Sequence, residues 1–202
     1  GHCSQAFLGN QFACFPTDAI RLVLDADKGC LKTLDELVLT LDKQTGLLIL
    51  DRILYTSTHY PANYGFIPRT WADDGDPLDV LVLCSECIRP LSLVECYLIG
   101  VITMEDGGSL DEKIIAIPFQ DPTYNTYQDI SELPDHVASE IKHFFRVYKS
   151  LEGKETVVSD VLGRQAAVDI IIKCQDAYIE KLQVTYSAAI PADGGAFSAG
   201  GK

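Results

Sequence analysis

Four carboxylates lie within seven residues in the segment Asp73-Asp74-Gly75-Asp76-Pro77-Leu78-Asp79, directly before an apolar run at residues 80–83. Like charges this close repel one another in a partly buried site, so either a loop keeps them solvated or cations neutralise them. Gly75 permits a tight turn and Pro77 stiffens it, which lets the carboxylates converge on one point. Because Mg²⁺ and other hard cations take oxygen ligands of this kind, the segment predicts a Mg²⁺ site. A solvated surface turn is the alternative, and a calcium EF-hand loop fits less well because Pro77 and the following strand break its pattern.

A second acidic segment, Glu105-Asp106-Gly107-Gly108-Ser109-Leu110-Asp111-Glu112, is a glycine-containing turn between two expected strands. Such a turn on its own is typical of a solvated surface. Beside the first segment it could supply further metal ligands, and the adjacent Lys113 would then be a cation next to a metal-bound anion.

Basic and phenolic side chains are few. Arg52 follows an expected strand, Tyr60 and Tyr64 flank Pro61-Ala62-Asn63, and Tyr148-Lys149 ends an expected helix. Arginine makes bidentate contacts to phosphate oxygens, lysine offers a point charge, and tyrosine offers a neutral donor. The alternative for the tyrosines is core packing with a bonded hydroxyl. For Lys149 the alternative is a cation favoured by the helix macrodipole.

Composition limits the partners. The chain has 202 residues with 29 acidic and 16 basic side chains, a formal charge of −13. That charge argues against broad nucleic-acid binding and against anionic membranes, but an anion could bind through divalent cations. No apolar run approaches the roughly 18 residues that span a bilayer, and the first residues lack a secretory signal pattern. We expect a cytoplasmic protein, or an organellar one if a transit peptide was removed.

The seven cysteines predict reduced intracellular thiols, because an odd, scattered number does not indicate a disulfide framework. Cys84 and Cys87 form a single CxxC motif. A structural zinc site would need a second ligand pair at matching spacing, so we interpret the two residues as small side chains that end a strand.

Short runs rich in Val, Ile and Leu predict strands in the first part of the chain, and turn signals separate them. The expected strands are Ile20–Leu24, Leu37–Leu41, Leu47–Leu50, Leu78–Leu83, Leu93–Met104 and Lys113–Ile117. The turn at residues 42–46 joins two of them and indicates a hairpin.

Helical periodicity begins after Ser131. Val137, Ile141, Phe144 and Tyr148 fall on one face of the first helix, and a second helix is expected over residues 163–183. Strands followed by helices predict an α+β domain, in which helices pack outside a closed or nearly closed β-barrel. We assign this domain to residues 18–186, a poorly patterned segment to 1–17 and a flexible Gly/Ala tail to 187–202.

Two motifs of the chain resemble those of a known family. The run His59-Tyr60-Pro61-Ala62-Asn63-Tyr64-Gly65-Phe66-Ile67-Pro68-Arg69-Thr70 leads into Asp74-Gly75-Asp76-Pro77-Leu78-Asp79 and resembles the central motif of the family I soluble inorganic pyrophosphatases. Matches in the same order extend the resemblance over roughly residues 20–183. They lie at residues 41–46, 50–52, 106–113, 115–118, 143–145 and 148–149.

The resemblance implies an OB-like five-stranded β-barrel with flanking C-terminal helices, and Mg²⁺-dependent hydrolysis of pyrophosphate to two phosphates. Asp74, Asp79 and Asp111 resemble ligands of the activating metals. Asp106 resembles a ligand of a metal that arrives with the substrate, and Asp76 resembles the general base for the attacking water.

The same resemblance implies how the substrate is bound. The residues that look like phosphate contacts are Arg52, Tyr64, Tyr148 and Lys149, while Lys113 and Tyr60 line the same site. It also implies three to four Mg²⁺ ions per site, with Mn²⁺ or Zn²⁺ as substitutes, and a homo-oligomer that is a hexamer or a dimer.

The chain departs from the family at one place. Val38-Leu39-Thr40 stands where the family usually has Lys-x-Glu, and the strand at residues 21–24 lacks a usual acidic residue. Lys32, Asp35 or Glu36 could fill these roles if their segment folds inward. Three functional hypotheses therefore stand. The first is an active pyrophosphatase, and the second is a catalytically weakened paralogue that acts as a metal- or phosphate-binding subunit. The third is a generic acidic β-barrel interaction module without specific divalent binding.

Overall fold

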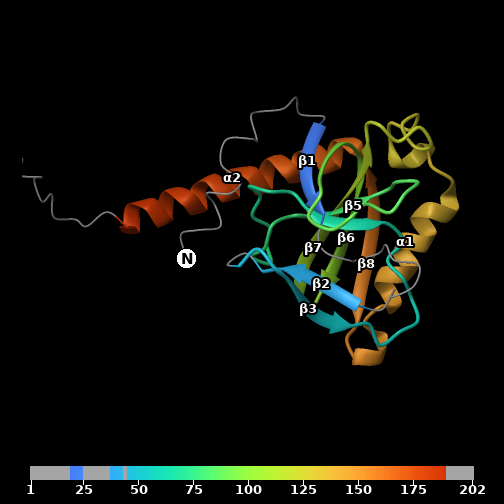
Figure 1. Cartoon of the computed structure of the whole chain (residues 1–202), viewed down its shortest axis with the longest axis horizontal. Coiled ribbons are helices and arrows are strands. Elements are labelled where there is room, and N and C mark those ends of the chain that lie inside the picture. The colour runs from blue at the N-terminus through green and yellow to red at the C-terminus, as the bar shows by residue number, and fades with distance from the viewer. Residues whose placement is uncertain (1–18, 25–36, 43–44, 190–202) are drawn as a thin grey trace, which may run out of the picture.

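A computed structural model describes residues 19–24, 37–42 and 45–189 of the chain. Five strands follow one another around a barrel in the order β1-β4-β5-β7-β6, because β1 pairs with both β4 and β6 (Figure 1). These strands are β1 (Ala19–Leu24), β4 (Asn63–Phe66), β5 (Asp79–Val82), β6 (Leu93–Asp106) and β7 (Ser109–Pro118). The β5–β7 pair is parallel, and the other pairs are antiparallel.

The long strand β6 pairs with different strands along one edge, first with β1 and then with β8 (Thr156–Gly163). Its first half pairs with β1, and its second half pairs with β8, with a shift in the β6–β8 register between Ile102 and Met104. A Cβ atom at Gly100 would lie 2.7 Å from the carbonyl oxygen of Leu162 and 2.9 Å from Cβ of Ile130. Glycine is therefore the residue that lets β6 and β8 approach each other here.

Both faces of β5 are buried. Val80 and Val82 belong to an apolar cluster that includes Ala167 and Ile171 of helix α2 (Arg164–Ala189). Leu81 faces the other way, into a cluster that includes the α1 side chains. Because alternate residues of a strand point to opposite faces, this double burial explains the uninterrupted apolar run at residues 80–83.

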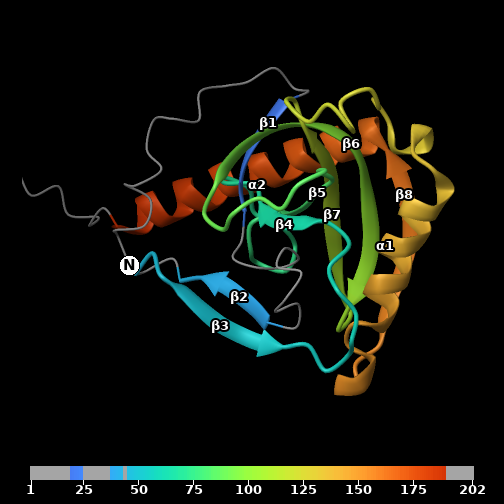
Figure 2. The same cartoon turned by 45° about the vertical axis from the view of Figure 1, so that its right-hand side comes forward.

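The helices lie outside the strands. Helix α1 (Asp135–Val147) lies along β8, and α2 crosses β6 and projects past the barrel (Figures 1 and 2). Two short 3₁₀ helices, η1 (Ile130–Glu132) and η2 (Ser150–Glu152), flank α1. The predicted α+β class, a five-stranded barrel with flanking helices, is confirmed.

A separate hairpin stands beside the barrel (Figure 2). Its strands are β2 (Leu37–Leu41) and β3 (Leu48–Ile53), and they form a two-stranded sheet of their own. Asp42 closes the turn, because its carbonyl accepts a 2.8 Å bond from the N–H of Gly46, whose φ is +73°. The predicted hairpin is confirmed.

Three sequence predictions need correction. No strand was predicted at β4 or β8, because β4 is short and contains Asn63 and Gly65, and β8 lacks a regular alternation of apolar and polar residues, with Ser159 and Asp160 adjacent and exposed. Strand β7 begins at Ser109, earlier than predicted, because the Gly107-Gly108 turn lets it pair with the end of β6. Helix α2 continues to Ala189, beyond its predicted end at residue 183.

Cysteine chemistry also differs from expectation. Cys84, Cys96 and Cys174 are free thiols, but Cys87 is disulfide-bonded, so the prediction of reduced thiols is wrong for Cys87. Across the described ranges, no helix is long and apolar enough to cross a bilayer.

Candidate active site

The acidic loop between β4 and β5 is folded on itself. The buried hydroxyl of Thr70 donates to the carbonyl of Ile67 at 2.6 Å and accepts from the N–H of Leu78 at 2.8 Å, which closes the base of the loop. At its tip, Oδ1 of Asp74 accepts a 3.0 Å bond from the N–H of Asp76. The loop therefore presents Asp74 and Asp76 beside the start of β5, where Asp79 begins the strand.

Helix α2 holds the outer side of this loop. The N–H of Trp71 donates to the carbonyl of Cys174 at 2.8 Å, and Nζ of Lys173 lies 2.9 Å from Oδ2 of Asp73. Nζ of Lys181 lies 4.5 Å from the centroid of the Trp71 indole ring. The packing of α2 thus helps to fix where the carboxylates of the loop point.

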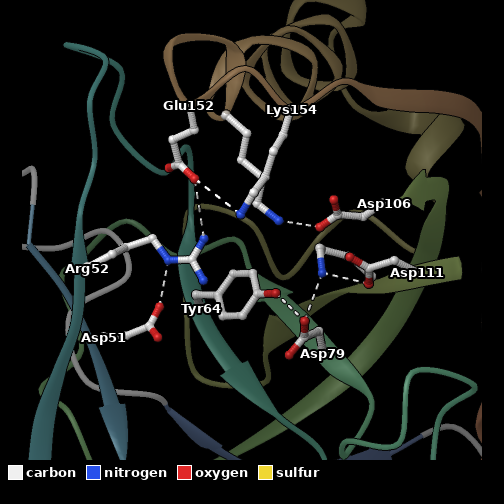
Figure 3. Close-up of polar contacts among 10 residues, drawn as sticks. Asp51, Arg52, Tyr64, Asp79, Asp106, Asp111, Glu152 and Lys154 are labelled. Carbon is white, nitrogen blue, oxygen red and sulfur yellow. Dashed lines mark hydrogen bonds and ion pairs between the residues drawn. The ribbon is translucent and has the colours of Figure 1, made fainter. Parts of the chain in front are cut away.

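Strand β7 brings the second acidic segment to the first. Lys113 is the register partner of Asp79, and its Nζ lies 2.8 Å from Oδ2 of Asp79 and 2.8 Å from Oδ1 of Asp111 (Figure 3). Burial lowers the pKa of Lys113, but the two carboxylates outweigh burial and hold the pKa above its usual value. One buried ammonium group therefore links Asp79 to Asp111.

Tyr64 completes this cluster from β4. Its buried hydroxyl donates to Oδ2 of Asp79, and Nζ of Lys113 lies 5.5 Å from the centroid of its ring. Burial, reinforced by the nearby Asp79 charge, raises the pKa of Tyr64. The ring of Tyr60 meets that of Tyr64 edge-on at 5.3 Å, and burial raises the pKa of Tyr60 as well. Both phenols therefore stay neutral donors near pH 7.

The end of α1 supplies the next pair. Tyr148 caps α1 and stacks on Phe144 at 5.3 Å, and burial raises the pKa of its hydroxyl. Lys149 follows immediately, and its Nζ forms an ion pair with Oδ2 of Asp106 at the end of β6. The C-terminal end of α1 thus places the Lys149 ammonium group in contact with Asp106 of the second acidic segment.

Arg52 enters from the hairpin. Its Nε lies 2.7 Å from Oδ2 of Asp51, and its Nη1 lies 4.0 Å from Oε2 of Glu152 in η2 (Figure 3). The charge of Arg52 also acts on the Tyr60 hydroxyl. The Arg52 guanidinium group therefore lies in the same region as the Tyr60 hydroxyl and η2, which follows Lys149.

All eleven residues that the sequence singled out gather in one region: Arg52, Tyr60, Tyr64, Asp74, Asp76, Asp79, Asp106, Asp111, Lys113, Tyr148 and Lys149.

The chemistry of the donor set fits a hard divalent cation, although its side chains, all among the described residues, are not gathered around one metal position. Burial raises the pKa of Asp74, and although the N–H of Asp76 opposes this, the charges of Asp111, Asp79 and Asp76 add to it. These like charges face one another and are oxygen donors, which is the chemistry that Mg²⁺ binds. Within the ranges that the structure describes, no three His, Cys, Asp or Glu side chains surround one metal position, and the Lys113 ammonium lies between two of the carboxylates.

Sequence reasoning missed three charged neighbours. Asp51 and Glu152 contact Arg52, and Nζ of Lys154 lies 3.6 Å from Oε2 of Glu152. Glu152 and Lys154 could have been found, because they closely follow Tyr148-Lys149 in the chain.

The departure at Val38 has a clear structural setting. Val38 is only 2% exposed, packs in the cluster that contains Leu54 and Tyr64, and is the register partner of Arg52. The wall of the site beside Arg52 is therefore apolar. Lys32, Asp35 and Glu36, the suggested substitutes for the missing charges, lie outside the described residues.

Known proteins match both the sequence and the fold. A family model described as inorganic pyrophosphatase matches residues 33–179. Soluble inorganic pyrophosphatase 2 of Chlamydomonas reinhardtii is 49% identical over 140 residues, which are 69% of this chain and 73% of that protein. Soluble inorganic pyrophosphatase 1 of Arabidopsis thaliana is also 49% identical over 140 residues, and this chain spans 66% of its length, slightly less than two thirds.

Solved structures agree. The inorganic pyrophosphatase of Helicobacter pylori superposes with a TM-score of 0.76 at 38% identity, over 84% of this chain and 99% of that one. The Thermus thermophilus enzyme gives 0.76 at 34% identity, over 83% and 95%. None of these likenesses favours the weakened binding subunit. The chain belongs to the family I soluble inorganic pyrophosphatases.

Proposed function

We propose that the chain hydrolyses inorganic pyrophosphate to two phosphates and depends on Mg²⁺. The observation that carries the proposal is the network in which Asp79, Asp111, Lys113 and Tyr64 meet beside Asp74. Such a site combines oxygen ligands for cations with donors for phosphate oxygens.

The acidic side chains would hold the metal. Asp74, Asp79 and Asp111 would bind the activating ions, and Asp106 would bind an ion that accompanies the substrate. Mg²⁺ held by these residues would lower the pKa of water and offset negative charge on the phosphoryl oxygens. By likeness to the family we propose three to four ions, with Mn²⁺ or Zn²⁺ as substitutes.

Asp76 would act as the general base. Its carboxylate lies on the exposed tip of the acidic loop, and the bond from its own N–H to Asp74 holds it near the metal ligands. It would accept the proton of the attacking water as the water oxygen bonds to phosphorus and the bridging P–O bond breaks, which releases the second phosphate.

The cations and phenols would bind the substrate. Arg52, Lys113 and Lys149 would offset the charge of the two phosphate groups. The raised pKa values of Tyr60, Tyr64 and Tyr148 keep these hydroxyls protonated. Tyr60 and Tyr148 could each donate a hydrogen bond to a phosphate oxygen, whereas the Tyr64 hydroxyl donates to Asp79 and would have to turn away from it to do so. Lys113 stays charged for the reason given above.

Phosphate release from pyrophosphate, with and without Mg²⁺, tests this function. We expect Asp76→Asn and Asp79→Ala to lower kcat at least about 100-fold, whereas Asp160→Asn on the exposed face of β8 leaves kcat unchanged. Turnover by purified protein that survives both substitutions would contradict the assigned roles. Lack of turnover by the wild type would contradict the function itself.

By likeness to the soluble relatives we also propose a cytoplasmic homo-oligomer, either a hexamer or a dimer, that binds neither nucleic acid nor membranes. Light scattering of the purified chain would measure the subunit number.

A further inference from the structure

Glu152 places one carboxylate between two cations at the edge of the site. It lies in η2, which follows Lys149, and its side chain is only 14% exposed. Its Oε2 lies 4.0 Å from Nη1 of Arg52 and 3.6 Å from Nζ of Lys154 (Figure 3). These two cations come from β3 and from the start of the segment that leads into β8.

The other oxygen of Glu152 is an unusual group for a folded protein. Oε1 is buried and has no hydrogen-bond partner in the described part of the chain. A buried polar atom without a partner costs free energy, which is why such atoms are rare.

Arg52 lies on an element outside the barrel, so the contact with Glu152 can fix where its guanidinium group lies. Arg52 belongs to the β2–β3 hairpin, which forms a sheet separate from the barrel among the described strands. Ladder hydrogen bonds of the barrel therefore do not fix Arg52 relative to Lys149 and Asp106. Asp51 holds the Nε edge of the guanidinium group from within the same strand, whereas Glu152 faces Nη1 from η2, on the other side of the site.

We propose that Glu152 is a positioning residue, which holds the Arg52 guanidinium group, together with the Lys154 ammonium group, toward the place where the substrate phosphate lies. This inference rests on the proposed function, because it concerns the binding of pyrophosphate. Glu152 contacts no reacting atom itself. Its carboxylate repels phosphate weakly, but the orientation of two cations outweighs that repulsion.

The test replaces the charge and keeps the shape. In the full chain, Glu152→Gln is expected to raise KM for magnesium pyrophosphate about tenfold and to change kcat less than twofold, because Asp76 and Asp79 are untouched. Glu152→Asp keeps the charge and is expected to recover part of the affinity. Glu155→Gln is the matched control, since Glu155 is exposed and lies three residues along the same segment.

A double-variant cycle asks whether Glu152 acts through Arg52. In an Arg52→Gln background, Glu152→Gln is expected to change KM less than twofold further. An equal factor in both backgrounds, or a lower KM for the single variant, would overturn the proposal.

Calorimetric titration with inorganic phosphate separates this inference from the proposed function, because it needs no turnover. Weaker phosphate binding by Glu152→Gln supports the inference even if the wild type does not hydrolyse pyrophosphate. Unchanged KM and unchanged phosphate affinity in an active protein refute the inference and leave the function standing.

Discussion

Lys113 is the register partner of Asp79 across the parallel strands β5 and β7, and Nζ of Lys113 lies 2.8 Å from the carboxylate of Asp79. The same Nζ reaches Asp111, two residues earlier on β7. A single buried lysine thus contacts two carboxylates that we propose as metal ligands and offsets one of their two negative charges. The ammonium group and a divalent cation therefore attract the same oxygens.

Lys113→Met keeps the length of this side chain and removes its charge. We expect the free energy of unfolding to fall by about 2–3 kcal/mol, because two partly buried carboxylates lose their partner. Added Mg²⁺ should stabilise the variant more than the wild type, since the cation replaces the missing charge. Urea unfolding with and without Mg²⁺ measures both effects.

The control for that experiment is Lys173→Met, which breaks an exposed ion pair with Asp73. Its expected cost is below about 1 kcal/mol. A Lys113→Met protein with the stability of the wild type, or with an unchanged response to Mg²⁺, would show that the ammonium group does not compensate for the metal.

Some features of the site and fold can be predicted from the sequence, and others cannot. The acidic loop could be predicted because Asp74, Asp76 and Asp79 are close in the chain, so their convergence needs only a turn. The contact of Lys113 with Asp79 joins residues 34 apart and depends on the register of a parallel pair, which no local pattern encodes. Strand β4 was missed for a similar reason, since its pairing with β1 and β5 outweighs the weak strand propensity of Asn63 and Gly65.

Residues at the ends of helices also show that local sequence patterns predict local contacts but do not predict contacts between distant segments. The start of α1 near Asp135 follows from a local signal, whereas the tie between η1 and α2 crosses 35 residues. Oδ2 of Asp129 accepts a 2.8 Å bond from the N–H of Arg164, the first residue of α2, and Oδ1 accepts a 3.0 Å bond from the N–H of Ser131. Only the folded chain brings these donors together.

Asp129→Ala should therefore show a pH-dependent cost. The bonds from Arg164 and Ser131 lower the pKa of Asp129 in the folded state. A lowered pKa stabilises the fold above the unfolded value of about 4, and this contribution is lost as pH falls below it. We expect a deficit of about 1 kcal/mol at pH 7 that shrinks by pH 3, measured by urea unfolding. Asp160→Ala is the control, and an equal deficit at both pH values would contradict the prediction.

Alanine substitutions at Gly100 and Gly46 compare the cost of steric crowding with the cost of backbone strain. Gly100→Ala would bring a Cβ within 2.7 Å of the carbonyl oxygen of Leu162, so we expect a loss of about 3 kcal/mol. Gly46→Ala meets no atom within 4 Å and carries only the strain of φ +73°, about 1 kcal/mol. Thermal unfolding of both variants measures the difference. Equal losses would contradict the prediction, because they would mean that relieving the contacts with Leu162 and Ile130 costs no more than the backbone strain at Gly46.

The last prediction concerns Val38 and Thr40, which lie on one face of β2 because they are two residues apart. Val38→Lys would place an ammonium group beside Arg52, its register partner, and Thr40→Glu would add a carboxylate on the same face. We expect the double variant to raise kcat/KM for pyrophosphate about three- to tenfold, because the added cation offsets phosphate charge.

This gain has a structural cost. Val38 is 2% exposed, so a lysine there should lower the free energy of unfolding by about 2 kcal/mol. Val38→Met with Thr40→Gln is the uncharged control and should not raise kcat/KM. The measurement is phosphate release from pyrophosphate by the wild type, the charged double variant and the uncharged control. An equal gain in kcat/KM for the uncharged control would rule out the electrostatic explanation. An inert wild type made active by Val38→Lys with Thr40→Glu would instead favour the weakened binding subunit.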